Sequence, residues 1–163
     1  MLRLSKLTDY AVVVLIRLAE DSCEPVQTSP GIALATGVPE PTVAKVLKAL
    51  GAAQLVTSQR GARGGYRLRQ TLDRVTIADV IAAIDGPIAL TACVDGSGGC
   101  CDVQNICAVK GRWDLVNDAI RDALTGITLA EMRRASVPPA FRLPAQASPA
   151  PISHGRAPIA AAE

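Results

Sequence analysis

The sequence predicts a mainly α-helical protein: a winged helix-turn-helix with a two-stranded wing, followed by a cysteine-rich loop and a long C-terminal helix. Three observations support this fold class. Two consecutive short segments with helical spacing of apolar residues are joined by a turn that contains glycine. Two strand-like segments flank an Arg/Gly loop directly after them. Four of the five cysteines then cluster ahead of another amphipathic segment.

These features divide the chain of 163 residues into four parts. We expect a winged helix-turn-helix over 1–86, a cysteine-rich loop over 87–111, a dimerisation helix over 112–135 and a disordered tail over 136–163. From residue 137 onward the chain has six prolines and no hydrophobic periodicity, which is typical of disorder.

The N-terminal segment predicts an amphipathic helix over residues 5–20 rather than an export signal. Its apolar run is short and is bracketed by Asp9 and Arg17, and no small-residue cleavage site follows. No segment of the chain approaches the length of a membrane span. We therefore expect a cytoplasmic protein with no membrane contact, in which thiols stay reduced.

The helix-turn-helix is predicted from helix start and stop signals. Ser29 is the expected N-cap of a short helix with Pro30 at its first position, and Gly37 can end it. A second helix is expected over 42–50, with apolar residues at helical spacing. These residues are Val43, Val46, Leu47 and Leu50.

The wing and a further helix follow. Residues 55–58 and 66–68 are strand-like, and the loop between them has the sequence RGARGG. A short helix is expected over 75–85, with Thr76 as its cap and Asp79 three positions on.

The last amphipathic segment predicts a long helix from Trp113 to about Met132. Its apolar stripe either packs on the protein's own domain or forms a homodimer interface. We favour the homodimer, because helix-turn-helix proteins usually read two half-sites about 34 Å apart. The stripe consists of Val116, Ile120, Ala123, Leu124 and Ile127.

The charge distribution favours double-stranded DNA as a partner of the first half. Residues 1–69 hold nine Lys/Arg and five Asp/Glu, a net +4, whereas residues 70–136 hold six and nine, a net −3. The start of the second helix would enter the major groove, and arginines on the glycine-rich wing suit a narrow minor groove. The alternative is a solvated basic face. The candidate DNA-binding residues are Thr28, Pro41, Thr42, Lys45, Lys48, Arg60, Arg63, Gly65 and Tyr66.

The cysteine segment contains Cys93, Cys100, Cys101 and Cys107. Their spacings do not match the C-x-x-C pairs of common zinc sites, and the single histidine lies in the tail. Several thiolates on a glycine-rich loop suit an iron–sulfur cluster. A metal-free thiol switch that uses the adjacent cysteines remains an alternative.

Four stretches together resemble the Rrf-two family of bacterial transcription regulators: LTDYAVVVLIRLA, TGVPEPTVAKVLKAL, RGARGGYRL and the cysteine loop. The resemblance covers about residues 1–135. The family includes IscR-like, NsrR-like and SUF-regulator branches, and the loop with its following helix is most similar to the SUF branch. The resemblance implies a homodimeric, cluster-sensing regulator of iron–sulfur assembly genes, in which the helix after the loop forms the dimer interface.

The resemblance also implies the cluster ligands. Cys93, Cys101 and Cys107 match the family's three cysteines and would hold a 2Fe–2S or 4Fe–4S cluster. The neighbouring Cys100 is an additional candidate, preferred less because Cys101 has the family-like spacing. The IscR pattern has a histidine where this chain has Lys110, so that ligand is absent. Asp9 matches an aspartate that NsrR-like members supply from the partner subunit, or else it is an ordinary first-turn acid.

Other function classes are weighed against this one. A nitric-oxide-sensing repressor of the same fold is the nearest alternative. An enzyme or electron carrier is disfavoured, because no catalytic histidine lies in the ordered part, and no nucleophile–base pair or phosphate-binding loop is visible.

Overall fold

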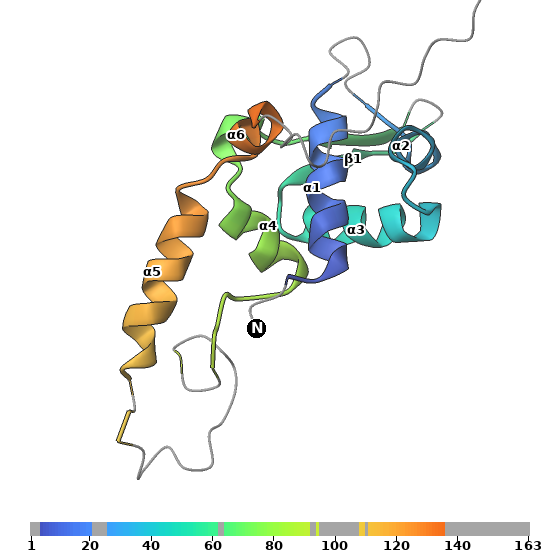
Figure 1. The fold of residues 1–163 in the computed structure, drawn as a ribbon. Coiled ribbons are helices and arrows are strands. Elements are labelled where there is room, and N and C mark those ends of the chain that lie inside the picture. Colours follow the sequence, from blue (N-terminus) through green and yellow to red (C-terminus); the bar gives the residue numbers. More distant parts are fainter. Residues whose placement is uncertain are drawn as a thin grey trace, which may run out of the picture.

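The computed structural model describes residues 4–20, 26–61, 64–91, 94, 108–109 and 111–135. A helical body carries a two-stranded antiparallel hairpin, and one helix, α5, extends away from it (Figure 1). The elements in order are α1 (Lys6–Leu18), α2 (Ser29–Thr36), α3 (Glu40–Ala52), β1 (Val56–Gln59), β2 (Gly65–Leu68), the 3₁₀ turn η1 (Leu72–Arg74), α4 (Ile77–Ile84), α5 (Trp113–Thr125) and α6 (Leu129–Arg134). The predicted mainly α winged helix-turn-helix is confirmed.

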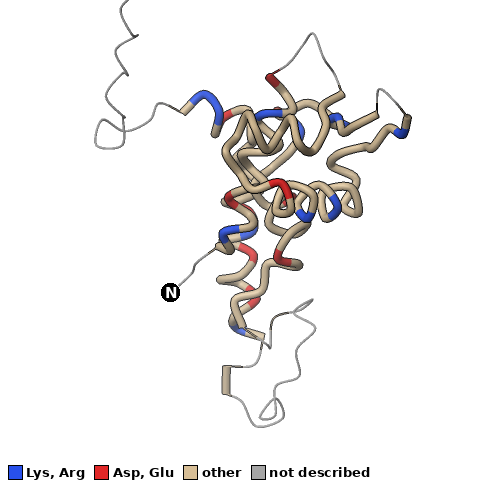
Figure 2. Tube along the Cα trace, turned by 90° about the vertical axis from the view of Figure 1, so that its right-hand side faces the viewer, with Lys and Arg blue, Asp and Glu red and all other residues tan. Residues whose placement is uncertain are grey.

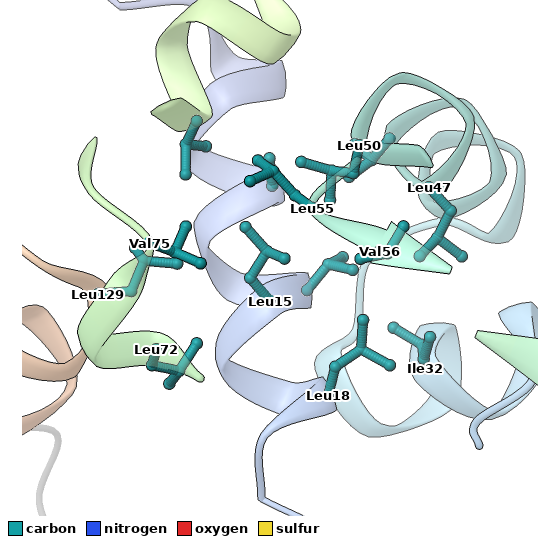
Figure 3. Packing of buried hydrophobic residues seen from close by; sticks show 14 of the residues in the cluster. Leu15, Leu18, Ile32, Leu47, Leu50, Leu55, Val56, Leu72, Val75 and Leu129 are labelled. Carbon is teal, nitrogen blue, oxygen red and sulfur yellow. The ribbon is translucent and has the colours of Figure 1, made fainter. Parts of the chain in front are cut away.

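The core is aliphatic and centres on α1. The inner face of α1 packs on α2, α3 and α4, and fully buried Leu15 lies among Leu55, Val56 and Val75 (Figure 3). The helical stripe predicted on α3 is buried completely. Because α1 contacts α2, α3, α4 and α6, it packs against each α-helix of the body.

The hairpin is joined to the body by backbone hydrogen bonds as well as by side chains. Val56 pairs with Leu68 and Gln59 with Gly65 in the antiparallel register. On the outer side of β2, Gln27 and Tyr66 exchange both backbone hydrogen bonds, at 2.9 and 2.8 Å. The buried Gln27 side chain also donates to the carbonyl of Arg17, so it holds the hairpin against the end of α1.

The start of α2 differs from the prediction by one residue. Thr28, not Ser29, is the N-cap, and its hydroxyl accepts a hydrogen bond from Gly31 N at 3.2 Å. Ser29 is the first helical residue and Pro30 the second, a position that proline also tolerates because its missing N–H would be unpaired. Gly37 ends the helix in the left-handed conformation, as predicted.

The long helix predicted over 113–132 is wrong, because the structure divides it into α5 and α6. Thr128 lies between them in extended backbone and pairs with Thr76. The carbonyl of Ile127 accepts from Ile77 N, and Leu129 N donates to Val75 O, both at 2.9 Å. A continuous helix would need these backbone groups for itself.

The second of these helices, α6, packs on the core of the N-terminal body. Leu129 is fully buried in the core of the winged helix-turn-helix, where it meets Val75 (Figure 3). The last helix thus packs on the N-terminal body, and a dimerisation role for residues 112–135 stays a prediction. A sequence signal for this existed: Thr128 and Glu131 form a capping box, just as Thr76 and Asp79 do at the predicted α4.

The start of α1 is tied to the end of α4 by Asp85. Its Oδ2 accepts hydrogen bonds from the buried Thr8 hydroxyl at 2.6 Å and from Ser5 N at 3.4 Å. Burial acts to raise the pKa of Asp85, but the hydrogen bonds from Thr8 and Ser5 outweigh it and hold the pKa below its ordinary value.

Replacing Thr8 by valine, which keeps the side-chain shape, is expected to lower the free energy of unfolding by about 1 kcal/mol at pH 7. The lowered pKa of Asp85 makes this contribution present above the unfolded-state pKa of about 4, and lost as the pH falls through the folded-state value. The two proteins should therefore approach equal stability in acid. Urea unfolding at pH 7 and pH 3 tests this, and a difference independent of pH would contradict it.

Candidate DNA-binding surface and cysteine segment

The exposed face of α3 carries most of the residues predicted to enter the major groove. Pro41, Lys45 and Lys48 are exposed, and Thr42 is half-buried at the helix start. The opposite face of α3 packs on α1, so this helix presents one polar face outward. The arrangement is that of a recognition helix.

The hairpin places Arg60 at its exposed end. The second predicted wing arginine, Arg63, lies outside the described residues. Gly65, predicted to contact DNA, has an internal role: a Cβ built there would lie 2.5 Å from the carbonyl oxygen of Gln27. A Cβ at Gly64 would meet the carbonyl oxygen of Gln59 at the same distance. These glycines let backbone segments of the wing and body approach closely.

Replacing Gly65 by alanine is expected to lower the free energy of unfolding by about 1–3 kcal/mol, because the new Cβ forces the β2–Gln27 pairing apart. The matched control is Gly51→Ala in α3, where a Cβ would have no neighbour within 4 Å. That change should raise stability by up to about 1 kcal/mol through helix propensity. Urea unfolding measures both, and equal effects of the two substitutions would contradict the assignment.

The two remaining predicted DNA contacts, Thr28 and Tyr66, also have structural roles. The exposed Thr28 caps α2, so its hydroxyl is already engaged by Gly31 N. Tyr66 is half-buried, packs against the core and pairs with Gln27 through its backbone. Either side chain remains a candidate DNA contact only from the surface that it leaves exposed.

A hollow of about 760 Å³ lies between the second half of α3 and the hairpin. We call it the α3–hairpin groove. Lys48, Arg67 and Arg69 line it together with small, apolar, hydroxyl and amide side chains, and no acidic residue lines it. Arg67 and Arg69 are not among the residues that the sequence predicted to contact DNA. The signal was present, since residues 41–72 contain no Asp or Glu.

The two signs of charge are unevenly distributed, although neither part of the molecule carries one sign alone. Figure 2 shows Lys and Arg positions on the side of the hairpin, and Asp and Glu positions that recur along the extended arm. That arm is α5, which contains Asp114, Asp118 and Asp122. The basic side is therefore the side suited to an anionic polymer.

The apolar face predicted on the last helix is exposed on α5. The side chains of Trp113 and Val116 in α5 are 41% and 43% exposed, and Leu115 is 79% exposed. Ile127, just after α5, is 42% exposed. Leu124 differs, because it packs partly against the core of the body. The stripe thus divides into a side that meets the protein's own domain and a larger side that no described residue covers.

The described residues just before the cysteine segment are held to α5. Cys93, Cys100, Cys101 and Cys107 lie outside the described residues. The described chain runs alongside α5 toward this segment (Figure 1). There Leu90 N donates to Oδ1 of Asn117 at 3.1 Å, and Asn117 is only 1% exposed.

Asp9, the additional candidate ligand, is exposed in the first turn of α1. It lines a surface hollow together with the apolar side chains of Leu4, Val12, Ile77 and Met132. Its carboxylate therefore faces solvent at the surface and is open to another molecule. Among the described residues there is no group of three or more His, Cys, Asp or Glu side chains that could hold a metal ion.

A family model named Rrf2 and described as "Iron-dependent Transcriptional regulator" matches residues 4–135. The chain belongs to the Rrf2 family. It is a DNA-binding transcriptional regulator with a winged-helix fold, and not an enzyme. No helix among the described residues of this Rrf2 protein is long and apolar enough to cross a membrane.

Individual relatives and solved structures agree with this assignment. The Rrf2 protein is 31% identical over 131 residues to the regulator IscR of Vibrio cholerae, covering 80% of this chain and 75% of that one. It is 28% identical over 131 residues to NsrR of Bacillus licheniformis, covering 80% and 92%. The structure of CymR, the global cysteine regulator of B. subtilis, has a TM-score of 0.61 and 28% identity over 81% of this chain and 96% of that one. The T. potens IscR structure has a TM-score of 0.58 and 25% identity over 86% and 97%.

Proposed function

We propose that this Rrf2 protein is a cytoplasmic, homodimeric repressor that senses an iron–sulfur cluster and controls iron–sulfur assembly genes such as a SUF operon. The observation that carries the proposal is the set of Cys93, Cys101 and Cys107 in one glycine-rich segment. Thiolates are the usual ligands of such clusters. The family description as iron-dependent regulators supports it.

The proposed DNA contacts are the exposed residues of α3 and the hairpin. Pro41, Thr42, Lys45 and Lys48 would meet the major groove, and Arg60 with Arg63 would meet the adjacent minor groove. Thr28, Gly65 and Tyr66 are proposed to support the same surface, chiefly by holding α2 and the hairpin in place.

The described residues also provide a route from the cysteine segment to DNA. Asn117 holds Leu90 to α5, while Asp85 at the end of α4 holds Thr8 at the start of α1. A cluster, when bound, supplies a thiolate-linked brace across residues 93–107. Loss of the cluster would release the start of α5 and so change the spacing of the two winged domains in a dimer. DNA and effector binding would then be reciprocally coupled.

A second candidate is a nitric-oxide-sensing repressor of the same fold. The exposure of Asp9 at the start of α1 favours it, because that carboxylate is free to reach a second subunit. The similarity to NsrR of Bacillus licheniformis is in keeping with this candidate.

Anaerobic purification followed by an absorption spectrum, iron and sulfide analysis, and binding to operator fragments tests the proposal. We expect a brown protein with iron and sulfide in matched amounts, whose DNA affinity changes when the cluster is removed. A protein that stays colourless after reconstitution yet binds DNA would contradict cluster sensing and support the metal-free thiol switch. Rapid bleaching by nitric oxide but not by oxygen would favour the second candidate.

A further inference from the structure

We propose that the α3–hairpin groove is a binding site for a phosphate of the DNA backbone, and that Gln54 positions Arg69 within it. The inference rests on the proposed DNA-binding function and deepens it by naming contacts that read no sequence. The groove combines three cationic side chains from elements well separated in the chain: Lys48 from α3, Arg67 from β2, and Arg69 directly after β2.

The groove continues the face of α3 that carries the recognition residues. Ala44, Lys48 and Gly51 line it at intervals of four and three residues, so they share one helix face. Lys45 and Pro41 border the same face nearer the helix start. On this proposal, a duplex held against the start of α3 and the wing passes over the groove and presents its sugar–phosphate backbone there.

The floor of the groove leaves room for a phosphate group. Gly51 has no side chain, and a Cβ built on it would meet nothing within 4 Å. Across the groove, Thr57 and Arg67 are paired residues of the hairpin, so both side chains lie on the same face of the sheet. Hydroxyl and guanidinium groups are the donors that phosphate oxygens accept from in protein–DNA complexes.

Gln54 is the unusual residue of the groove. It follows α3 and has a φ of 62°. Among the described residues, no other residue except glycine has a positive φ. Gln54 N donates to Gly51 O, and Leu55 N donates to Leu50 O, which is the Schellman ending of a helix. Glycine is the usual residue at this position, because a Cβ is disfavoured in the left-handed conformation.

The side chain of Gln54 supplies a reason for its presence. Its Oε1 accepts a hydrogen bond from Nη1 of Arg69, and its amide nitrogen lies 3.4 Å from the carbonyl oxygen of Gly51 as a donor. The left-handed backbone at Gln54 thus accompanies an amide that holds the guanidinium of Arg69, and both residues line the groove. Strain of this kind is retained where it is part of a function.

The test compares Arg69→Gln, Gln54→Gly and Arg74→Gln, with binding to an operator duplex and to an unrelated duplex measured over a range of salt concentrations. Arg74 is an exposed arginine of η1 that does not line the groove. Arg74→Gln is therefore the matched control, because it removes one positive charge away from the groove. Arg69→Gln should weaken binding to both duplexes by about tenfold and reduce the log–log salt slope by about 1. Arg74→Gln should leave the slope unchanged.

Gln54→Gly separates the positioning role from a purely structural one. Removing the left-handed strain should raise the unfolding midpoint, yet DNA affinity should fall for both duplexes, because Arg69 loses its partner. Unchanged affinity in Gln54→Gly would overturn the positioning role. An unchanged salt slope in Arg69→Gln would overturn the groove while leaving the regulator proposal intact. Failure of the unaltered protein to bind any duplex would overturn both.

Discussion

Replacing Val116 by aspartate is expected to convert the protein from a dimer to a monomer and to weaken operator binding by at least about 100-fold. Val116 lies on the exposed apolar side of α5 and is 43% exposed, so the monomer can fold with a charge there. In a dimer the same side chain would be covered by the partner, and a carboxylate without a partner is costly to bury. Loss of the dimer removes one of two linked half-site contacts.

The exposed side of α5 explains why this substitution acts on assembly. Within α5, Trp113, Val116, Ile120 and Ala123 are separated by three, four and three residues. That is the spacing of a seam between two helices. Asn117 and Leu124 lie to one side of the seam, where α5 meets its own domain. No described residue covers the outer side of this seam, so we expect a second copy of the chain to pack there.

Thr125→Asp is the matched control, because it adds the same charge on the opposite, polar face of α5. Sedimentation analysis at micromolar concentration and titration of an operator duplex measure both variants. A Val116→Asp protein that sediments as a dimer would contradict the α5 interface. A monomer that keeps full operator affinity would contradict the need for two half-sites.

Most of the helical body could be predicted because its signals are local. The apolar stripe of α3, the ending of α2 at Gly37 and the capping box of α4 depend on residues within a turn of each other. The hairpin was predicted for the same reason, since two short strand-like segments flank a glycine-rich loop. Local signals of this kind survive in the folded chain when tertiary packing agrees with them.

The errors arose where a distant segment decides the structure. The helical spacing of apolar residues continues through residue 127, but α5 ends before it. The backbone groups of Ile127 and Leu129 form hydrogen bonds with Ile77 and Val75 instead of within a helix. Thr128 and Glu131 form a capping box, which indicates the start of a new helix, but the apolar stripe favoured one continuous helix. Hydrophobic periodicity alone does not report whether one helix or two carry it.

The groove was missed for a similar reason. Arg69 is fifteen residues from Gln54, and their contact depends on the left-handed backbone at the end of α3. Nothing in the spacing of Lys48, Arg67 and Arg69 shows that they line one hollow. The close approach of Gly64 and Gly65 to the backbone of other segments could not be predicted either, because the sequence does not show which backbone atoms lie beside a glycine.

Replacing Cys93, Cys101 or Cys107 by alanine is expected to abolish the iron–sulfur chromophore. Cys100→Ala should keep it, and so should Cys23→Ala, which removes the fifth cysteine, far from the segment. Each of the three proposed ligands supplies a thiolate that no neighbouring His or Cys at ligand spacing replaces, apart from Cys100 beside Cys101. Iron and sulfide content per chain, measured after anaerobic purification and reconstitution, should therefore fall to background in three variants and remain unchanged in two.

The pair Cys100 and Cys101 makes this series decisive about ligand identity. Cys101 lies six positions before Cys107, the spacing that the family resemblance implies, while Cys100 is displaced by one residue. A cluster that survives in Cys101→Ala but is lost in Cys100→Ala would assign the ligand to Cys100. A cluster lost in both would make Cys100 a fourth ligand and would remove the need for Asp9. Because Asp9 is exposed at the start of α1, Asp9→Ala should leave folding intact. A faster loss of the cluster in Asp9→Ala than in the unaltered protein would then identify its carboxylate as the remaining ligand.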